Sequence, residues 1–357
     1  MAKPHSIIGI IKEISPSVKR LKTRDAERYE EINFQDGKIS LLDKTDPKSE
    51  IWSDILHSSY QSQSPVYVEI DPNTQVITEF LLPLKVKVSE ISSINDTVKV
   101  ELFISQAHHY LKRSNPDFTS LLEILQNAKE KNSNVLVTEN HETHEIINVQ
   151  PSPNNNSTTT ELFESPSAPI SPFAATVVTI QKANELFQLV NSTTCSPTKG
   201  TAPCIPFLYP DDGCWGRAHE MCRLLLKTGV VPQKVWIYGN LRVATKNNPL
   251  CEVRWGWHVA PTLRVHSGSG SRIQVIDPSC FTRPVTQTQW VNIQGDPSPM
   301  IVMSDASVFH RSRNGNIIYD DNSYSQTKRV LDTYRNYLKL RSASSSGPPP
   351  YSHCITT

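Results

Sequence analysis

Hydrophobic and polar positions follow different patterns in the two halves of this chain. Before residue 150 the apolar residues fall in short β-type runs, at residues 6–14, 29–42, 66–70, 76–88 and 98–104. One segment, residues 117–131, instead carries Leu121, Leu122 and Leu125 at helical spacing. The pattern predicts an N-terminal part that is mostly β with one helix, an arrangement compatible with a small barrel.

Helical spacing returns after residue 213. Residues 210–212 (PDD) are typical of a helix start, and apolar residues then recur at helical spacing over 218–226. Cys214 therefore lies in the first turn of a helix, where unpaired N–H groups and the helix dipole favour the thiolate. Gly213 just before it allows a tight turn and leaves room for a substrate. A cysteine in this position is a candidate nucleophile.

Two β-type runs come next, and they bring a histidine close to a carboxylate. His258 lies in the apolar run 253–265, and Asp277 ends the next run, 272–277. The Gly- and Ser-rich turn between the runs predicts an antiparallel hairpin. His258 would face Asp277 directly if the turn were centred between residues 267 and 268. Such a carboxylate orients the imidazole, which in turn holds a thiol deprotonated.

Each member of this Cys-His-Asp set also has a structural interpretation. Most free cysteines are buried and inert, a histidine in an apolar strand is usually a core residue, and Asp277 before Pro278 is a common turn former. The combination of all three favours catalysis by Cys214, His258 and Asp277. The sequence alone does not place the helix start against the hairpin.

Four separated motifs extend this picture: DGCWGRAH at 212–219, YGNL at 238–241, WGWHVA at 255–260 and VIDPS at 275–279. In order and spacing they resemble the motifs of bacterial protein-glutaminases, over about residues 174–340. The resemblance implies a transglutaminase-like, papain-type fold and deamidation of glutamine side chains in proteins and peptides. By motif, Cys214 matches the nucleophile, His258 the base and Asp277 the orienting acid.

The resemblance has two further implications and one departure. It implies an inhibitory pro-segment before the catalytic part, and a disulfide between Cys195 and Cys204, which bracket a short loop that such a bond could close. Two free loop thiols are the alternative. The aromatic residue before the histidine is Trp257 here, which departs from the family pattern and affects the acyl pocket rather than the triad.

Composition divides the chain into domains. With 357 residues it is long enough for two cores. Residues 151–173 are rich in Pro, Ser, Thr and Asn without periodicity, which is typical of a linker. We therefore expect an α+β protein with four parts: a mostly-β N-terminal domain at 1–150, the linker, a catalytic domain at 174–341 and a disordered tail at 342–357.

The two halves carry opposite net charge. Residues 1–150 hold 17 Lys and Arg against 22 Asp and Glu, whereas the remainder holds 19 against 13. Opposite charge is common on docking surfaces, so we expect the N-terminal domain to inhibit the Cys214 cleft until the linker is cut. Two unconnected domains are the alternative.

Composition also limits partners and location. A net charge of +1 and no basic run give no sign of nucleic acid or a membrane surface, and no apolar segment reaches the length of a membrane span. Residues 7–11 are too short a core for a signal peptide, so the sequence leaves the location open: secreted, as the family resemblance implies, or cytoplasmic if no export route exists. No cofactor or metal is expected, because side chains alone can carry the chemistry.

The predicted reaction passes through a thioester. Cys214 attacks the glutamine carboxamide, ammonia leaves, and water hydrolyses the acyl-enzyme. Trp215, Trp255 and Trp257 are candidate walls for the glutamine stem, with core packing as the alternative. A transglutaminase or a cysteine peptidase would use the same triad, and an inactive transglutaminase-like binding module is the non-enzymatic alternative.

Overall fold

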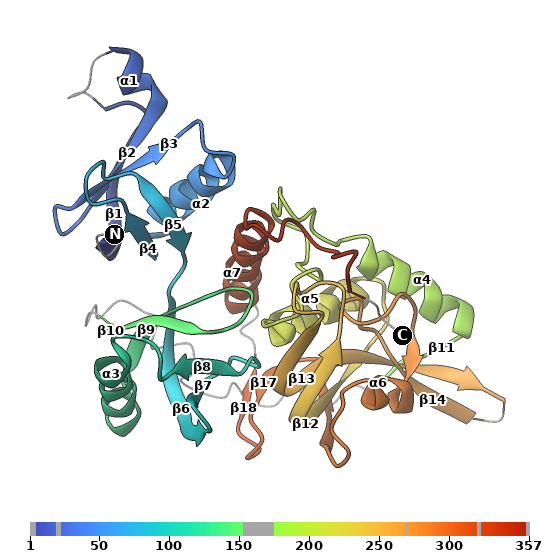
Figure 1. Cartoon of the computed structure of the whole chain (residues 1–357). Helices are drawn as coiled ribbons and strands as arrows, with labels where there is room; N and C mark the ends of the chain where they lie inside the picture. Colours follow the sequence, from blue (N-terminus) through green and yellow to red (C-terminus); the bar gives the residue numbers. More distant parts are fainter. Residues whose placement is uncertain (1–4, 19–22, 153–174, 269, 320–322, 355–357) are drawn as a thin grey trace. The chain divides into compact units, whose positions relative to one another are not determined.

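The computed structural model describes residues 5–18, 23–152, 175–268, 270–319 and 323–354 (Figure 1). Contacts divide the chain into two compact units. Unit 1 comprises Met1–Phe103, His109–Ser152 and Lys339–Pro348, and unit 2 comprises Ile104–His108, Pro153–Leu338 and Pro349–Thr357. The short segment Ile104–His108 therefore belongs to unit 2, although unit 1 lies before and after it in the chain. Almost all of the expected linker, 151–173, lies outside the described residues.

Unit 1 contains the same succession of elements twice: three strands, a helix and two strands. The first copy also has a short helix, α1 (Thr23–Arg28), after its first strand. Its other elements are β1 (His5–Ser15), β2 (Tyr29–Phe34), β3 (Ile39–Asp43), α2 (Ser49–Ser62), β4 (Pro65–Ile70) and β5 (Ile77–Leu81). The second copy is β6 (Leu84–Ile94), β7 (Thr97–Leu102), β8 (His109–Lys112), α3 (Phe118–Glu130), β9 (Asn134–Glu139) and β10 (Ile146–Pro151).

The two copies share one sheet topology. Their strand orders, β3-β2-β1-β4-β5 and β8-β7-β6-β9-β10, are equivalent. In each copy a parallel bridge joins the two outer strands, Leu41 with Val76 and Tyr110 with Glu145. A five-stranded barrel with a helix between its third and fourth strands has the topology of the OB-fold. Unit 1 is therefore a tandem pair of small barrels, where the sequence pattern suggested one.

The repeat is also present in the sequence. Asp71 and Asn140, 69 positions apart, each begin the turn before the last strand of their copy. Asp71 Oδ1 accepts the backbone N–H groups of Asn73 and Thr74, and Asn140 Oδ1 accepts the corresponding groups of Glu142 and Thr143. The same kind of side chain thus shapes the same turn in both copies.

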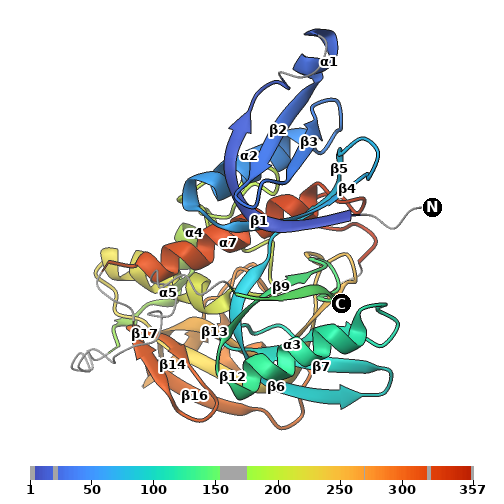
Figure 2. The same cartoon turned by 90° about the vertical axis from the view of Figure 1, so that its left-hand side faces the viewer.

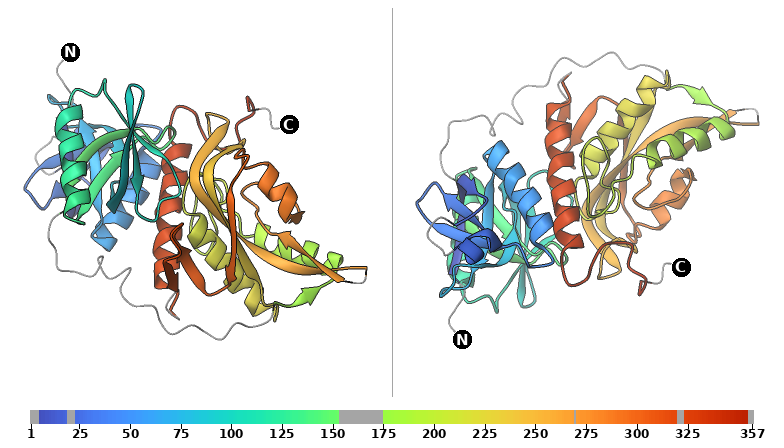
Figure 3. Two further views of the ribbon diagram at one scale, coloured as in Figure 1. Left: turned by 90° about the horizontal axis from the view of Figure 1, so that it is seen from below. Right: turned by 90° about the horizontal axis from the view of Figure 1, so that it is seen from above.

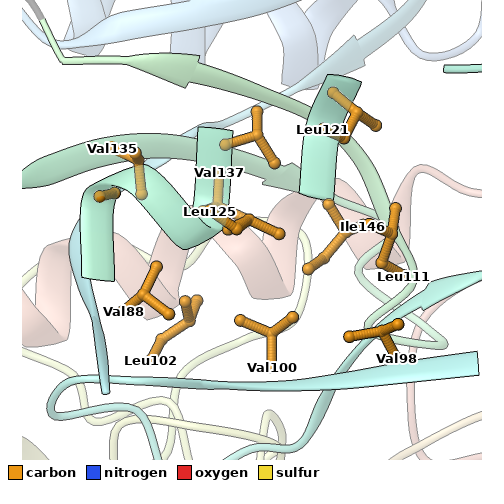
Figure 4. Close-up of a cluster of buried hydrophobic side chains, with 12 residues drawn as sticks. Val88, Val98, Val100, Leu102, Leu111, Leu121, Leu125, Val135, Val137 and Ile146 are labelled. Atoms are coloured by element: carbon orange, nitrogen blue, oxygen red, sulfur yellow. The ribbon is translucent and has the colours of Figure 1, made fainter. Parts of the chain in front are cut away.

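The core of the second copy explains why its helix forms. Leu121 and Leu125 of α3 point into a cluster of valines and leucines from the surrounding strands (Figure 4). Figure 2 shows α3 beside β6, which it contacts. The helix predicted at 117–131 is therefore confirmed, because its apolar positions at helical spacing are buried on the barrel.

Other N-terminal expectations need correction. The described residues of this region contain three helices rather than one, and α2 buries Trp52, Ile55 and Leu56 at helical spacing. The turn that contains His144 also takes part in a buried hydrogen-bond cluster. Glu139 accepts hydrogen bonds from the Nδ1 atoms of His109 and His144, and all three side chains are buried or nearly so.

Unit 2 is built on an antiparallel sheet of order β15-β14-β13-β12-β16. Its helices α5 and α6 lie on opposite sides of this sheet (Figure 3). Before β12 come β11 (Val177–Val178), which joins the same sheet by pairing parallel with β13, and the helices α4 (Ile180–Asn191) and α5 (Cys214–Lys227). The later elements are β12 (Gln233–Ala244), β13 (Glu252–Ser267), β14 (Gly270–Val275), β15 (Val285–Thr286), α6 (Gln287–Asn292), β16 (Met300–Asp305), β17 (Val308–Arg311), β18 (Ile317–Tyr319) and α7 (Ser325–Ser342). The last residues of α7, from Lys339, are assigned to unit 1.

The fold class is thus mixed, with helices packed on mostly antiparallel sheets. The expected disordered tail is wrong for its described part, up to residue 354. A disulfide joins Cys354 to Cys251, and the backbone N–H of Tyr351 donates to the carbonyl of Lys246 at 2.7 Å. A covalent bond and a buried Tyr351 therefore hold residues 349–354 on unit 2.

The predicted hairpin forms, but its register differs from the expectation. Ser267 pairs with Gly270 and Thr262 pairs with Val275, so the turn lies one residue later than predicted. His258 is therefore not directly opposite Asp277, which lies just beyond the end of β14. The short β14 also pairs only with residues 262–267 of β13 and leaves the earlier half of that strand edge open to another segment.

Candidate active site

The start of α5 places Cys214 at the end of a tight turn. The residue preceding the helix is Gly213, with a φ of 81°, and no side chain caps the helix. A Cβ atom at this position would lie 2.3 Å from the ring of Tyr334. Gly213 therefore permits the turn as predicted, but the space it leaves is filled by Tyr334 rather than by a substrate. The expected cap from the preceding aspartates is absent in this part of the structure.

A buried arginine holds the loop before this helix. The Arg217 guanidinium donates to the carbonyl oxygens of Tyr209 at 2.9 Å and Pro210 at 3.3 Å, and also to that of Asp212. Only 2% of Arg217 is exposed. Since three carbonyls share one rigid guanidinium, the turn that carries Cys214 is fixed from within the fold.

The ring of His258 is held on three sides. It stacks on Trp255, with ring centroids 4.4 Å apart, and on Trp290 of α6, at 5.5 Å. Its Nε2 lies 2.9 Å from Oδ2 of Asp277. Its Nδ1 is buried and has no hydrogen-bond partner among the described residues. The ring is therefore oriented by its neighbours and keeps one nitrogen available for a reacting group.

Asp277 stays ionised although it is buried. Burial alone would raise its pKa, but interactions with His258 and a hydrogen bond from Trp290 Nε1 at 2.9 Å more than offset this and lower the pKa. An ionised carboxylate stabilises the imidazolium form of His258. The sequence placed these two groups together correctly, although it did not predict Trp290.

The sulfur of Cys214 lies beside the strand that carries His258. It accepts a hydrogen bond from the backbone N–H of Val259, the residue after His258. Burial raises the pKa of the thiol well above its usual value, whereas the Arg217 guanidinium and this N–H act in the opposite direction. The thiol form is therefore favoured with the site closed, against the thiolate expected from the helix start alone. The helix start and the hairpin, which sequence could not bring together, contact each other in unit 2.

The segment Ile104–His108 lies along the open edge of β13. Ala107 forms an antiparallel bridge with Trp255, and the Gly256 N–H donates to the carbonyl of Gln106 at 2.9 Å. The Trp257 indole N–H donates to the carbonyl of Ser105 at 3.1 Å. This segment therefore binds in the manner of an added β-strand.

The side chain of Gln106 reaches the start of α5. Its carboxamide oxygen accepts the backbone N–H of Cys214 at 2.8 Å, and its amide nitrogen donates to the carbonyl of Pro210 at 3.3 Å. Only 1% of Gln106 is exposed. Sequence reasoning missed this residue, because a five-residue segment without a motif carries no local signal of what it binds.

The tryptophans singled out from the sequence have different surroundings. Trp255 stacks on His258 and donates to the carbonyl of Asp211 at 2.9 Å. Trp215 and Trp257 lie with ring centroids 5.8 Å apart. Trp255 therefore supports the His258 ring. Trp257 contacts the bound segment through Ser105, and Trp215 packs beside Trp257. Their role as substrate walls stays a prediction.

Cysteines of unit 2 form two disulfides, Cys195–Cys204 and Cys251–Cys354. The first was expected from the family resemblance. The described residues also contain three clusters of His, Cys and acidic side chains close enough to share an ion. One is His258 with Asp277 and Cys280 in the candidate site, one contains both cysteines of a disulfide, and one is the His109, Glu139 and His144 set, whose atoms already bond one another.

Comparison with known proteins identifies the class. A glutaminase family model matches residues 183–294. The crystal structure of a pro-protein-glutaminase is 27% identical, with a TM-score of 0.57, and the match covers 77% of this chain and 99% of that one. A mutant of pro-protein-glutaminase matches similarly, at 27% identity, TM-score 0.56, and coverage of 77% and 100%. No curated protein sequence matches.

The crystal structure of a protein-glutaminase is 32% identical, with a TM-score of 0.42, and the match covers 52% of this chain and 100% of that one. The chain belongs to the protein-glutaminase family, and it includes a pro-region. Within the described residues, none of the helices is both long and apolar enough to cross a membrane.

Proposed function

We propose that Cys214, His258 and Asp277 form the catalytic triad of a protein-glutamine deamidase. The chain is an enzyme of this class, a hydrolase acting on the side-chain carboxamide of protein-bound glutamine. The observation that carries the proposal is the bound carboxamide itself. The side-chain oxygen of Gln106 already accepts a hydrogen bond from the backbone N–H of Cys214, at 2.8 Å.

In the first half-reaction, the sulfur of Cys214 attacks the carboxamide carbon as His258 Nδ1 takes the thiol proton. The backbone N–H of Cys214 stabilises the oxyanion that forms, since it already binds the carboxamide oxygen. His258 then donates the proton to the leaving nitrogen, and ammonia departs from a thioester. Asp277 stabilises the transient imidazolium through its hydrogen bond to Nε2.

In the second half-reaction, water adds to the thioester. His258 takes the proton of the water through the same Nδ1 atom and returns a proton to the departing sulfur, which regenerates the thiol and leaves a glutamate side chain. The nucleophile helix against an antiparallel sheet supports the transglutaminase-like interpretation of the catalytic unit. The remaining domain limits, a catalytic part from 174 and a linker before it, stay part of this proposal.

The segment Ile104–His108 supports an inhibitory role for the N-terminal region. It belongs to unit 2 by its contacts, and it covers Cys214, of which 1% is exposed. A protein substrate would need the same strand edge and the same N–H donor. We therefore propose that cleavage within 151–173 permits release of the segment and activates the enzyme, as the pro form of the related structures suggests.

Two disulfides within the described residues also support a location. Such bonds persist mainly in oxidising compartments. We propose that the protein acts outside the reducing cytoplasm, as expected from the family resemblance.

The experiment that tests the function compares the products formed from one substrate. The linker-cleaved chain is incubated with a glutamine-containing protein and a primary amine, and ammonia, new carboxylates, incorporated amine and new peptide termini are quantified. The proposal expects ammonia and new glutamate in equal amounts. Amine incorporation would indicate a transglutaminase, new termini a peptidase, and no product a binding module; each result contradicts the proposal.

A further inference from the structure

We propose that Gln106 is itself a substrate, so that the enzyme deamidates its own inhibitory segment and thereby weakens the hold of that segment on the active site. This inference rests on the function proposed above. It goes further because a segment that merely blocks the site would not need a reactive carboxamide at its centre.

The orientation of the side chain is that of a reacting group. The carboxamide oxygen accepts a hydrogen bond from the backbone N–H of Cys214 at 2.8 Å, and the amide nitrogen donates one to the carbonyl of Pro210 at 3.3 Å. The carbon between them is thereby held next to the residue that bears the thiol. The reverse amide orientation would place N–H against N–H and oxygen against oxygen, so the local groups select this one.

The backbone on both sides of the side chain is fixed. The N–H of Gln106 donates to Oδ1 of Asp212 at 3.0 Å, and its carbonyl accepts the N–H of Gly256 at 2.9 Å. Ile104 adopts a φ of 80°, which is unfavourable for a β-branched residue and requires support from its surroundings. The segment is thus held in a specific conformation that delivers Gln106, as a positioned substrate must be.

The reaction balances without any reagent besides water. The thiol of Cys214 adds to the Gln106 carbon, and its proton passes through His258 to the amide nitrogen. The C–N bond breaks, ammonia leaves and a thioester joins residues 106 and 214. Water then adds, the C–S bond breaks, and the products are the free thiol and a glutamate at position 106.

The product binds less well than the starting side chain. Glutamate lacks the N–H that Gln106 donates to Pro210, so an oxygen would face a carbonyl oxygen in a buried site. It also adds a negative charge close to Asp212, which already binds the backbone of this segment. Deamidation therefore favours departure of the segment, and it makes the first turnover a step of activation.

The test is peptide mapping of the intact, full-length chain by mass spectrometry. A mixture contains the wild-type chain and a heavy-isotope-labelled Cys214→Ala chain. We expect residue 106 of the wild-type chain to be glutamate or to be joined to Cys214 with loss of ammonia, and residue 106 of the labelled chain to stay glutamine. Gln294, which is fully buried, is the control and stays an amide in both.

A companion variant gives a second readout. Gln106→Glu carries the product side chain from the start, so the uncleaved variant should release ammonia from a test protein several-fold faster than uncleaved Gln106→Met, which cannot react. Equal rates would contradict the proposed weakening of the segment.

Failure of this inference can be separated from failure of the proposed function. If residue 106 stays glutamine in the wild-type chain while the linker-cleaved form of the same preparation deamidates a test protein, self-deamidation is excluded and the enzyme function stands. If the linker-cleaved form also releases no ammonia, the function itself fails. Conversion of the labelled Cys214→Ala chain to glutamate would show reaction between molecules and would overturn the role of Gln106 as a substrate of its own chain.

Discussion

His258 depends on its neighbours for its orientation. The ring lies between the indoles of Trp255 and Trp290, and Asp277 binds its Nε2. Trp290 also donates to the same carboxylate oxygen of Asp277, so one oxygen accepts two hydrogen bonds. This arrangement leaves Nδ1 as the nitrogen that, in the proposed mechanism, exchanges protons with Cys214 and substrate.

Replacing the carboxylate should therefore affect catalysis far more than removing one of its donors. We expect Asp277→Asn to lower kcat/KM of the linker-cleaved chain by about 100-fold or more, in the range of general acid–base contributions. The control Trp290→Phe keeps the carboxylate and its hydrogen bond to His258. Its kcat/KM should therefore fall by less than about 10-fold. Steady-state ammonia release measures both, and similar losses in the two variants would contradict this role for Asp277.

Sequence reasoning was most effective at this scale, because the chemistry of a triad depends on a few residue types. It placed His258 near Asp277 from strand length and turn composition. It missed Trp290 and Gln106, whose roles depend on packing between segments far apart in the chain. It also overestimated how far the helix start favours the thiolate of Cys214, because burial raises the pKa of the thiol.

At the scale of elements, α5 has a glycine at each end with the same backbone conformation. Gly213 and Gly229 both have a φ of 81°. A Cβ atom at Gly213 would meet the Tyr334 ring at 2.3 Å, whereas one at Gly229 would meet nothing within 4 Å. A substitution at Gly229 therefore tests backbone strain alone, whereas one at Gly213 tests the same strain together with a steric clash.

We expect Gly229→Ala to cost about 1–2 kcal/mol of unfolding free energy, the usual cost of a left-handed conformation for an L-residue. Gly213→Ala should cost more, because the clash with Tyr334 adds to the same strain. Chemical denaturation of the two variants measures the difference. Equal losses would mean that Tyr334 moves freely and does not shape the turn before Cys214.

Some helices and strands were predicted from the sequence, and others were missed or displaced. The helix at α3 was predicted correctly because its leucines recur at helical spacing. The helix α2 carries the same signal at Trp52, Ile55 and Leu56, and comparison with α3 across the repeat would have revealed it. The hairpin of β13 and β14 was predicted with a turn one residue too early, because a loop rich in Gly and Ser allows several turn positions.

At the scale of the whole molecule, a short segment that lies in the chain between two parts of unit 1 occupies the candidate active site of unit 2. Ile104–His108 has no motif that would reveal this, and its contact with Cys214 joins residues more than a hundred positions apart. Likewise, the pairing of Cys251 with Cys354 could not be deduced, because cysteine spacing does not determine partners. Opposite charge of the two halves indicated only that they could associate.

Closure of the site has a consequence for thiol chemistry. In the intact chain, burial raises the pKa of Cys214, so the reactive thiolate is scarce at neutral pH and grows as the pH rises. We expect iodoacetamide to label Cys214 slowly at pH 7 in the intact chain, faster at higher pH, and faster at pH 7 once the linker is cut and the segment is released. Mass spectrometry of the labelled peptide measures this, and equal rates at pH 7 in intact and cleaved chains would contradict coverage by Ile104–His108.

The proposed mechanism depends most on the identity of the nucleophile. Helix α5 offers a matched pair of free, buried cysteines, Cys214 at its start and Cys222 two turns later. The decisive measurement is ammonia release from a glutamine-containing protein by linker-cleaved chains carrying either Cys214→Ala or Cys222→Ala. The mechanism predicts no detectable release from Cys214→Ala and a rate close to wild type from Cys222→Ala. Ammonia release by the Cys214→Ala chain at a rate near wild type would contradict it.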